Sequence, residues 1–220
     1  MLATGGIKRA LLLCGDVSTN SVNYEDKSSY PLFGDSGSAT ALEHDKNAKS
    51  SWFNLGSDGE GHKAIMIKGG GTKHKFHKDS LEVQDISPGI KRHELNIILE
   101  GLDIFNFSVK EVPKNIKELF EFSDINIEEV DYFVFHQANK IINETIRKKL
   151  KIDSEKVPYS LTNFGNTSSG SIPLTMQTEL QNALTTGNKS LLLSGFGVGL
   201  SWGSALVNTN KIIIPDLIEI

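Results

Sequence analysis

A short internal repeat constrains the fold of this chain more than any other feature. Residues 10–15 read ALLLCG and residues 190–195 read SLLLSG; each run is followed by a second one, GSATAL at 37–42 and GSALV at 203–207. Self-similarity of this kind indicates duplicated structural units. The second copy follows a long series of other elements, whereas the first begins almost at residue 1. We therefore expect the elements that should precede residue 8 in a first unit to be missing.

The repeated runs belong to a wider alternation of strands and helices. The apolar run 10–14 is typical of a strand buried on both faces, and we predict further strands at 39–42, 132–135, 190–195 and 202–207. Helical spacing predicts two segments within 94–122, with a break or kink at Pro113, a helix over 141–150 and another after 171. The polar stretch 43–92 is expected to form loops and edge structure. This order favours a layered α/β fold.

Composition excludes several classes of function. The 220 residues carry a net charge of −4 that is spread along the chain, so a nucleic-acid partner is not expected. No apolar run approaches the roughly 20 residues of a membrane helix, so no membrane span is expected. Cys14 is the only cysteine, which rules out an internal disulfide and suits a reducing compartment such as the cytoplasm.

Two other patterns predict no site. His74 and His77 form an HxxH pair, but the lysines around them would repel a cation, so no metal is expected. The glycine turn at 195–199 has GxGxG spacing and precedes a predicted strand, unlike the loop that binds a dinucleotide before a helix.

Two polar residues are candidates for catalysis. His136 lies at the carboxyl edge of the strand predicted at 132–135, and Asn166 lies in a loop of glycines and hydroxyl residues before a helix. Neutral imidazole and amide donors can stabilise a developing oxyanion. Taken singly, His136 could be structural and Asn166 could cap the following helix.

Four motifs in order resemble β-ketoacyl-acyl carrier protein synthase III, in the thiolase superfamily. They are FGDSGSA at 33–39, FHQAN at 135–139, GNTSSGSIP at 165–173 and GFGVGLSWGSAL at 195–206. The resemblance implies a layered α/β/α fold of two similar halves. Residues 1–45 would supply the last two strands of the first half, and residues 46–220 a complete second half with a mixed five-stranded sheet. The segment with the nucleophilic cysteine is absent from the chain, and Cys14 is expected to be a buried strand residue instead.

The resemblance also implies a reaction. An acyl group moves from coenzyme A to a cysteine, and the enolate formed by decarboxylation of malonyl-acyl carrier protein then attacks it. His136 and Asn166 would stabilise that enolate, and the backbone N–H of Gly199 would face the oxyanion of the acyl-cysteine species. Phe105 would contact the thioester and pantetheine, while Lys140 and Arg147 would help dock the carrier protein. No cofactor is implied beyond these substrates, and the family's setting is fatty acid biosynthesis by a homodimer.

Two departures concern the same contacts. Leu102 is apolar where the family has a polar residue, and Ile141 stands where well-known members have a basic one.

Two hypotheses remain open. The chain is the C-terminal part of an acyltransferase, inactive without the cysteine segment, or it is a stand-alone, non-catalytic module that binds an acyl thioester or carrier protein. Acyl-chain and extender specificity are not readable from the sequence.

Overall fold

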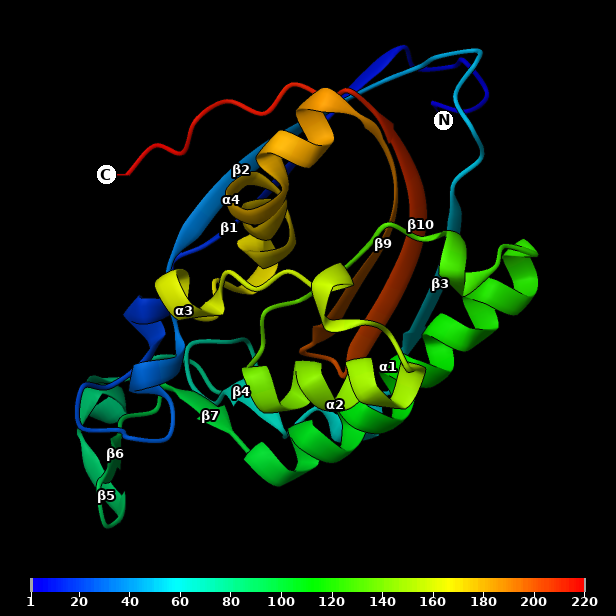
Figure 1. The fold of residues 1–220 in the computed structure, drawn as a ribbon. Coiled ribbons are helices and arrows are strands. Elements are labelled where there is room, and N and C mark those ends of the chain that lie inside the picture. The colour runs from blue at the N-terminus through cyan, green and yellow to red at the C-terminus, as the bar shows by residue number, and fades with distance from the viewer. Residues whose placement is uncertain (1, 220) are drawn as a thin grey trace.

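A mixed four-stranded sheet forms the centre of the structure, a computed structural model that describes residues 2–219 (Figure 1). Its strand order is β3 (Trp52–Ser57), β10 (Ser201–Asn210), β9 (Asn188–Gly197) and β8 (Tyr132–Phe135). β8 runs parallel to β9, and the other two pairs are antiparallel. The expected fifth strand is not found in the described residues, because β4 (Ile65–Ile67) pairs with β7 (Ile97–Leu99) in a separate sheet.

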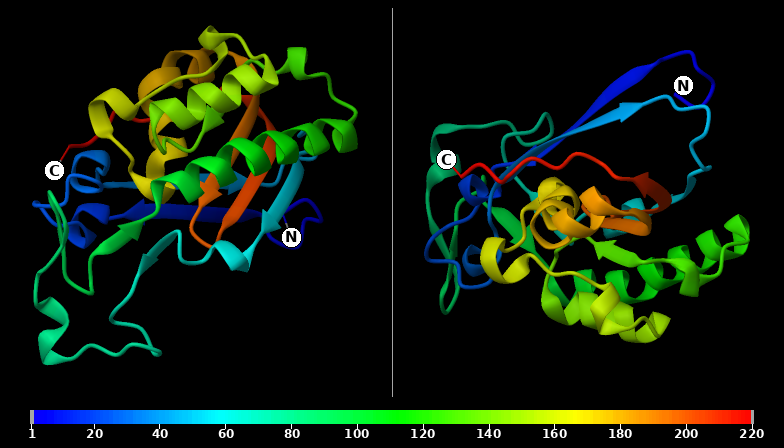
Figure 2. Two further views of the ribbon diagram at one scale, coloured as in Figure 1. Left: turned by 90° about the horizontal axis from the view of Figure 1, so that it is seen from below. Right: turned by 45° about the horizontal axis from the view of Figure 1, so that its top comes forward.

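Helices cover both faces of this sheet, and a second strand pair forms a further layer (Figures 1 and 2). α1 (Gly101–Ser123) packs on one face and carries α2 (Lys140–Leu150) beside it. α4 (Ser171–Thr186) packs on the opposite face, where it also contacts β2 (Ser36–Glu43). β2 pairs with β1 (Arg9–Asp16), so the order is helices, sheet, helix, strand pair. The predicted layered α/β fold is confirmed.

Side chains of β8 alternate between two hydrophobic clusters, as the period of a strand requires. Phe133 and Phe135 pack under α1 and α2, whereas Val134 packs under α4 with Leu184 and Leu191. A parallel strand covered on both faces is expected to be apolar throughout. The same burial fixes the position of His136, the next residue, at the carboxyl edge of the sheet.

The internal repeat is present in the strand pairing. Cys14 lies opposite Ser38 in the β1–β2 pair, and Ser194 lies opposite Ser204 in the β9–β10 pair. These are corresponding positions of the two sequence copies, so the copies share sense and register as well as sequence.

The prediction that the first strand is buried on both faces was wrong. Leu11, Leu12 and Leu13 are 62%, 52% and 68% exposed. Leu191 and Leu192 of the second copy are buried under α4 and α1, whereas none of the described hydrophobic clusters includes the leucines of β1.

The predicted break at Pro113 was also wrong, since α1 is one helix that contains the proline. A proline cannot donate to the carbonyl four residues earlier, which here is that of Val109. Lys149 on α2 supplies a replacement donor, because its Nζ lies 2.8 Å from the Val109 oxygen. Residues 97–99, which were expected to be helical, form β7.

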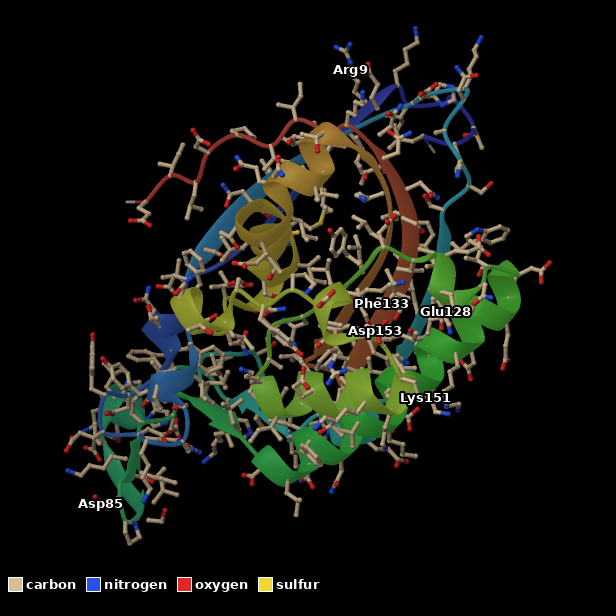
Figure 3. The ribbon with its side chains drawn as sticks, in the orientation of Figure 1. Arg9, Asp85, Glu128, Phe133, Lys151 and Asp153 are labelled. Atoms are coloured by element: carbon tan, nitrogen blue, oxygen red, sulfur yellow. The ribbon has the colours of Figure 1, made fainter. Side chains whose placement is uncertain are left out.

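The stretch 43–92 forms loops and edge structure, as predicted. β3 is an edge strand of the central sheet, and β5 (Gln84–Ser87) pairs with β6 (Ile90–Arg92) in a projecting hairpin. Figure 3 labels Asp85 on this hairpin and Arg9 at the opposite end of the molecule. The remaining helical elements are α3 (Leu161–Phe164) and seven 3-10 turns at Ser18–Ser21, Tyr30–Leu32, Gly59–Gly61, Lys78–Leu81, Ile127–Glu129, Ser154–Lys156 and Ser168–Gly170. Within residues 2–219, none of the helices has the length and apolar character to span a bilayer.

Candidate functional site

The structure brings His136, Asn166 and Phe105 to one cavity of about 920 Å³. His136 comes from the end of β8, Asn166 from the loop before α4, and Phe105 from the first turns of α1. Most of the wall is apolar, with Ile65, Leu99 and Trp202 among its residues. Two polar donors on an apolar wall are typical of a site that orients a small reacting group.

His136 is held by a hydroxyl group and by an aromatic ring. Its Nδ1 lies 2.7 Å from Oγ of Ser171, and its ring packs edge-on against Phe196 with centroids 5.4 Å apart. Burial lowers the pKa of His136 to about 4, while a hydrogen bond with the Ser168 backbone opposes the shift. The imidazole keeps some exposure through the cavity it lines. It is therefore a neutral group at neutral pH on the wall of the cavity.

Asn166 is not the N-cap of the helix that follows, because α4 begins after Gly170. Its Oδ1 accepts a hydrogen bond from the Ser168 N–H at 2.9 Å, within the turn before α4. That bond also orients the amide, because the oxygen is committed and Nδ2 remains as the donor. Asn166 lines the cavity, and the accepting oxygen and the proposed donor nitrogen belong to the same amide group.

The glycine turn lies at the rim of the same cavity. Gly197 and Val198 line it, whereas Gly199 is not among its lining residues. Gly199 has a φ of +142°, and a Cβ there would lie 2.2 Å from Oγ of Ser201, so glycine is required by the turn itself. The role of the Gly199 N–H towards an oxyanion stays a prediction.

The two basic residues predicted for docking differ in availability. Lys140 is exposed between Asn139 and Ile141, which both line the cavity. Arg147 is 16% exposed, and its guanidinium pairs with Glu144 and donates to the Ile152 carbonyl at 2.7 Å. These bonds hold the guanidinium at the C-terminal end of α2, so Arg147 is less available to a partner than the exposed Lys140.

Cys14 and the two histidines of the HxxH pair lie outside the site. Cys14 is on β1 and does not line the cavity, and it is half-buried rather than buried. Nε2 of His77 lies 3.2 Å from a carboxylate oxygen of Glu94. In the described part of the chain, no group of three or more His, Cys, Asp or Glu side chains is placed to hold a metal.

Sequence reasoning missed Ser171 and the segment 32–34 as supports of the site. Ser171 contacts His136 across 35 positions, and Leu32 and Gly34 bond the backbone of Asn166. Each support depends on contacts between distant segments. A serine three residues before a helical pattern carries no signal that would identify its partner.

A smaller cavity of about 240 Å³ lies away from these residues, at the C-terminal end of α2. Figure 3 labels four residues that line it, Glu128, Phe133, Lys151 and Asp153. It shares no residue with the larger cavity.

Two family models match the chain. Residues 1–59 match the model for 3-oxoacyl-[acyl-carrier-protein] synthase III, and residues 120–209 match the model for its C-terminal part. Together the matches contain Asn166, His136 and the glycine turn.

Relatives and solved structures carry the same name. Beta-ketoacyl-[acyl-carrier-protein] synthase III of Prochlorococcus marinus (strain MIT 9215) is 34% identical over 209 residues, covering 94% of this chain and 60% of the relative. The protein of the same name from Lactococcus lactis subsp. cremoris (strain MG1363) is 30% identical over 218 residues, covering 94% and 62%. The crystal structure of 3-oxoacyl-(acyl-carrier protein) synthase from Burkholderia xenovorans LB400 superposes with a TM-score of 0.86 at 34% identity, covering 97% of this chain and 59% of that one. The chain thus spans about three fifths of the length of the proteins it matches.

Proposed function

The chain belongs to the 3-oxoacyl-[acyl-carrier-protein] synthase III family of the thiolase superfamily, and on that basis we propose that it holds and decarboxylates the malonyl thioester in an acyltransferase. One observation carries the proposal. His136 and Asn166 are two neutral donors on the wall of one large, mostly apolar cavity.

The donors act on the charge that decarboxylation creates. When the carbon–carbon bond to the carboxylate breaks, carbon dioxide leaves. The electron pair of that bond moves towards the thioester oxygen. Nε2–H of His136 and Nδ2–H of Asn166 stabilise this enolate. Its carbon then attacks the carbonyl carbon of an acyl thioester, whose carbon–sulfur bond breaks as the thiolate leaves. Donors fixed before the reaction need no reorganisation as the charge develops, which is the basis of oxyanion-hole catalysis.

A nucleophile for acyl loading comes from another segment under this proposal. Cys14 does not line the cavity, whereas Phe53 and Leu55 of β3 line it and are 62% and 78% exposed. An apolar sheet face of this kind fits a covering element. We propose that a cysteine-bearing segment covers it, takes the acyl group from acyl-CoA and completes the site, and that the chain alone does not condense.

The remaining assignments follow from the same reaction. Phe105 contacts the thioester and its pantetheine arm, and Lys140 attracts the acidic surface of an acyl carrier protein. The complete enzyme acts as a homodimer in cytoplasmic fatty acid biosynthesis, with acyl-CoA and malonyl-acyl carrier protein as substrates and no bound cofactor.

A second candidate is a non-catalytic module that binds acyl thioesters or carrier protein. The absence of a cysteine from the described walls of the cavity favours it. The two functions differ in the activity expected when a cysteine-bearing segment is added to the chain.

Fusion to a cysteine-bearing N-terminal segment of a relative tests both. The condensing function predicts a 3-oxoacyl product from acyl-CoA and malonyl-acyl carrier protein with the fusion, and none when its cysteine is changed to serine. Release of carbon dioxide from the malonyl thioester by the unfused chain would support the decarboxylation step directly. Tight binding of acyl-CoA with neither carbon dioxide nor product, despite a folded fusion, would favour the binding module.

A further inference from the structure

Ser171 is the first residue of α4 and the hydrogen-bonding partner of the His136 imidazole. Its Oγ lies 2.7 Å from Nδ1 of His136, and the residue is 1% exposed. The Oγ also accepts the backbone N–H of Gln137 at 3.3 Å. One hydroxyl group therefore joins the helix that begins the Asn166 side of the site to the strand end that carries His136.

Counting hydrogens decides the direction of the bond between Ser171 and His136. The Gln137 N–H already occupies one acceptor position of the serine oxygen. If Nδ1 carried the proton, the oxygen would accept twice and its own buried hydrogen would lack an acceptor among the described groups. If Nδ1 is the acceptor, the hydroxyl donates to it and every group is satisfied.

The Ser168 backbone, a second group beside the imidazole, does not change this count. The Ser168 carbonyl accepts the N–H of Ser171 in the turn that precedes α4. A proton on Nδ1 that bonded to this carbonyl would still leave the Ser171 hydroxyl hydrogen without a partner. A buried donor is rarely left in that state.

We propose that Ser171 is a positioning residue that holds neutral His136 as its Nε2–H tautomer by donating its hydroxyl hydrogen to Nδ1. The proposal rests on the function given above, because an Nε2–H group is the donor that an enolate oxygen needs. It goes further by assigning the origin of that donor to a residue that bonds the other ring nitrogen, Nδ1. Loss of the hydroxyl then acts through His136, as second-contact residues do for other histidines.

The tautomer can be measured without any assay of activity. In the ¹⁵N-labelled chain, long-range ¹H–¹⁵N correlations identify which ring nitrogen of His136 carries the proton, and His136→Gln assigns the signal. We expect protonated Nε2 and unprotonated Nδ1 at pH 7. A wild-type chain with the proton on Nδ1 would overturn the proposal, whatever any variant does.

Variants test the contribution of the hydroxyl. Ser171→Ala is expected to populate the Nδ1–H tautomer, whereas Ser171→Thr keeps a hydroxyl and is expected to restore Nε2–H. Ser123→Ala removes a buried helical hydroxyl elsewhere, one that bonds the Phe120 carbonyl, and should leave the His136 signals unchanged. An unaltered tautomer in folded Ser171→Ala would also overturn the proposal.

Kinetics separates this inference from the proposed function. In the fusion with a cysteine-bearing segment, Ser171→Ala should lower kcat for carbon dioxide release about 10-fold or more, with KM nearly unchanged. A loss of this size is in the range expected for a misplaced catalytic donor. The expected tautomers in a chain that never decarboxylates would leave this inference standing and remove the proposed function. Full kcat in Ser171→Ala with the Nδ1–H tautomer would count against the inference alone.

Discussion

Phe33 and Asn166 form a parallel β-bridge between two segments that are 133 positions apart in the sequence. The Asn166 N–H donates to the Leu32 carbonyl at 2.8 Å, and the Gly34 N–H donates to the Asn166 carbonyl at 3.1 Å. The loop that leads into β2 thus holds the backbone of a candidate catalytic residue. Contacts within residues 163–171 alone would not fix its position.

Gly34→Ala should break this bridge. A Cβ at Gly34 would lie 2.0 Å from the Phe164 carbonyl oxygen, so the two segments must separate. We expect a loss of about 1–3 kcal/mol in the free energy of unfolding, as for other overpacked sites. Gly37→Ala is the matched control, because nothing lies within 4 Å of a Cβ there. Urea unfolding of the two variants measures the difference, and equal midpoints would contradict the role given to the bridge.

His136→Ala and Asn166→Ala should each reduce carbon dioxide release from a malonyl thioester. The loss of one oxyanion donor typically lowers kcat by about 10²–10³-fold. Asn163→Ala, at an exposed position of α3 just before this loop, is the control and should keep wild-type activity. The rate is measured with radiolabelled malonyl-acyl carrier protein in the fusion with a cysteine-bearing segment. Wild-type rates in both site variants would remove the enolate assignment.

The stability of the chain should fall as the pH drops from 6.5 towards 4 through His136. Burial lowers its pKa from 6.5 to about 4 in the folded chain, so below pH 6.5 the unfolded chain binds this proton more readily. The contribution is fully present above pH 6.5, and its loss is complete below about pH 4. The shift corresponds to at most about 3 kcal/mol, and water in the cavity reduces it.

Urea unfolding across this pH range measures the His136 contribution as the difference between wild type and His136→Gln. The variant lacks the titrating ring, so its curve should be flatter between pH 6.5 and 4. Parallel curves for the two proteins would show that His136 is not protonated preferentially on unfolding.

Lys140→Glu should weaken the use of acyl carrier protein more than the use of a small malonyl thioester. Lys140 is exposed between two residues of the cavity wall, where its charge can attract an acidic partner. We expect KM for the carrier protein to rise several-fold at low salt, and less at high salt because of screening. Lys117→Glu makes the same charge change on exposed α1, away from the cavity. Equal effects of the two changes would show a general effect of net charge.

The fold was predictable where a pattern depends on near neighbours. The runs at 132–135 and 190–195 lie between covering layers, so apolar composition alone identified both strands. Pro113 shows the opposite case, because the carbonyl that it leaves without its helical donor is bonded by a lysine on another helix. The exposure of Leu11–Leu13 could not be predicted from the pattern either. An apolar run looks the same in a strand that other layers cover as in one that they do not.

The candidate site divides in the same way. His136 and Asn166 were identified by motifs in order, and both line one cavity, while their catalytic roles stay a prediction. Ser171, Leu32 and Gly34 support them through single long-range hydrogen bonds, which leave no periodic trace. Arg147 was predicted as a surface cation, but Glu144 three residues earlier engages it.

The open side of β1 has a consequence for handling the protein. Among residues 2–219, β1 pairs only with β2, so its other backbone edge is unpaired while leucines on both of its faces are exposed. An unpaired apolar edge recruits further strands and leads to aggregation. We expect the yield of soluble protein to rise when a segment that covers this edge is coexpressed. Solubility would then identify such a segment before any substrate is tried.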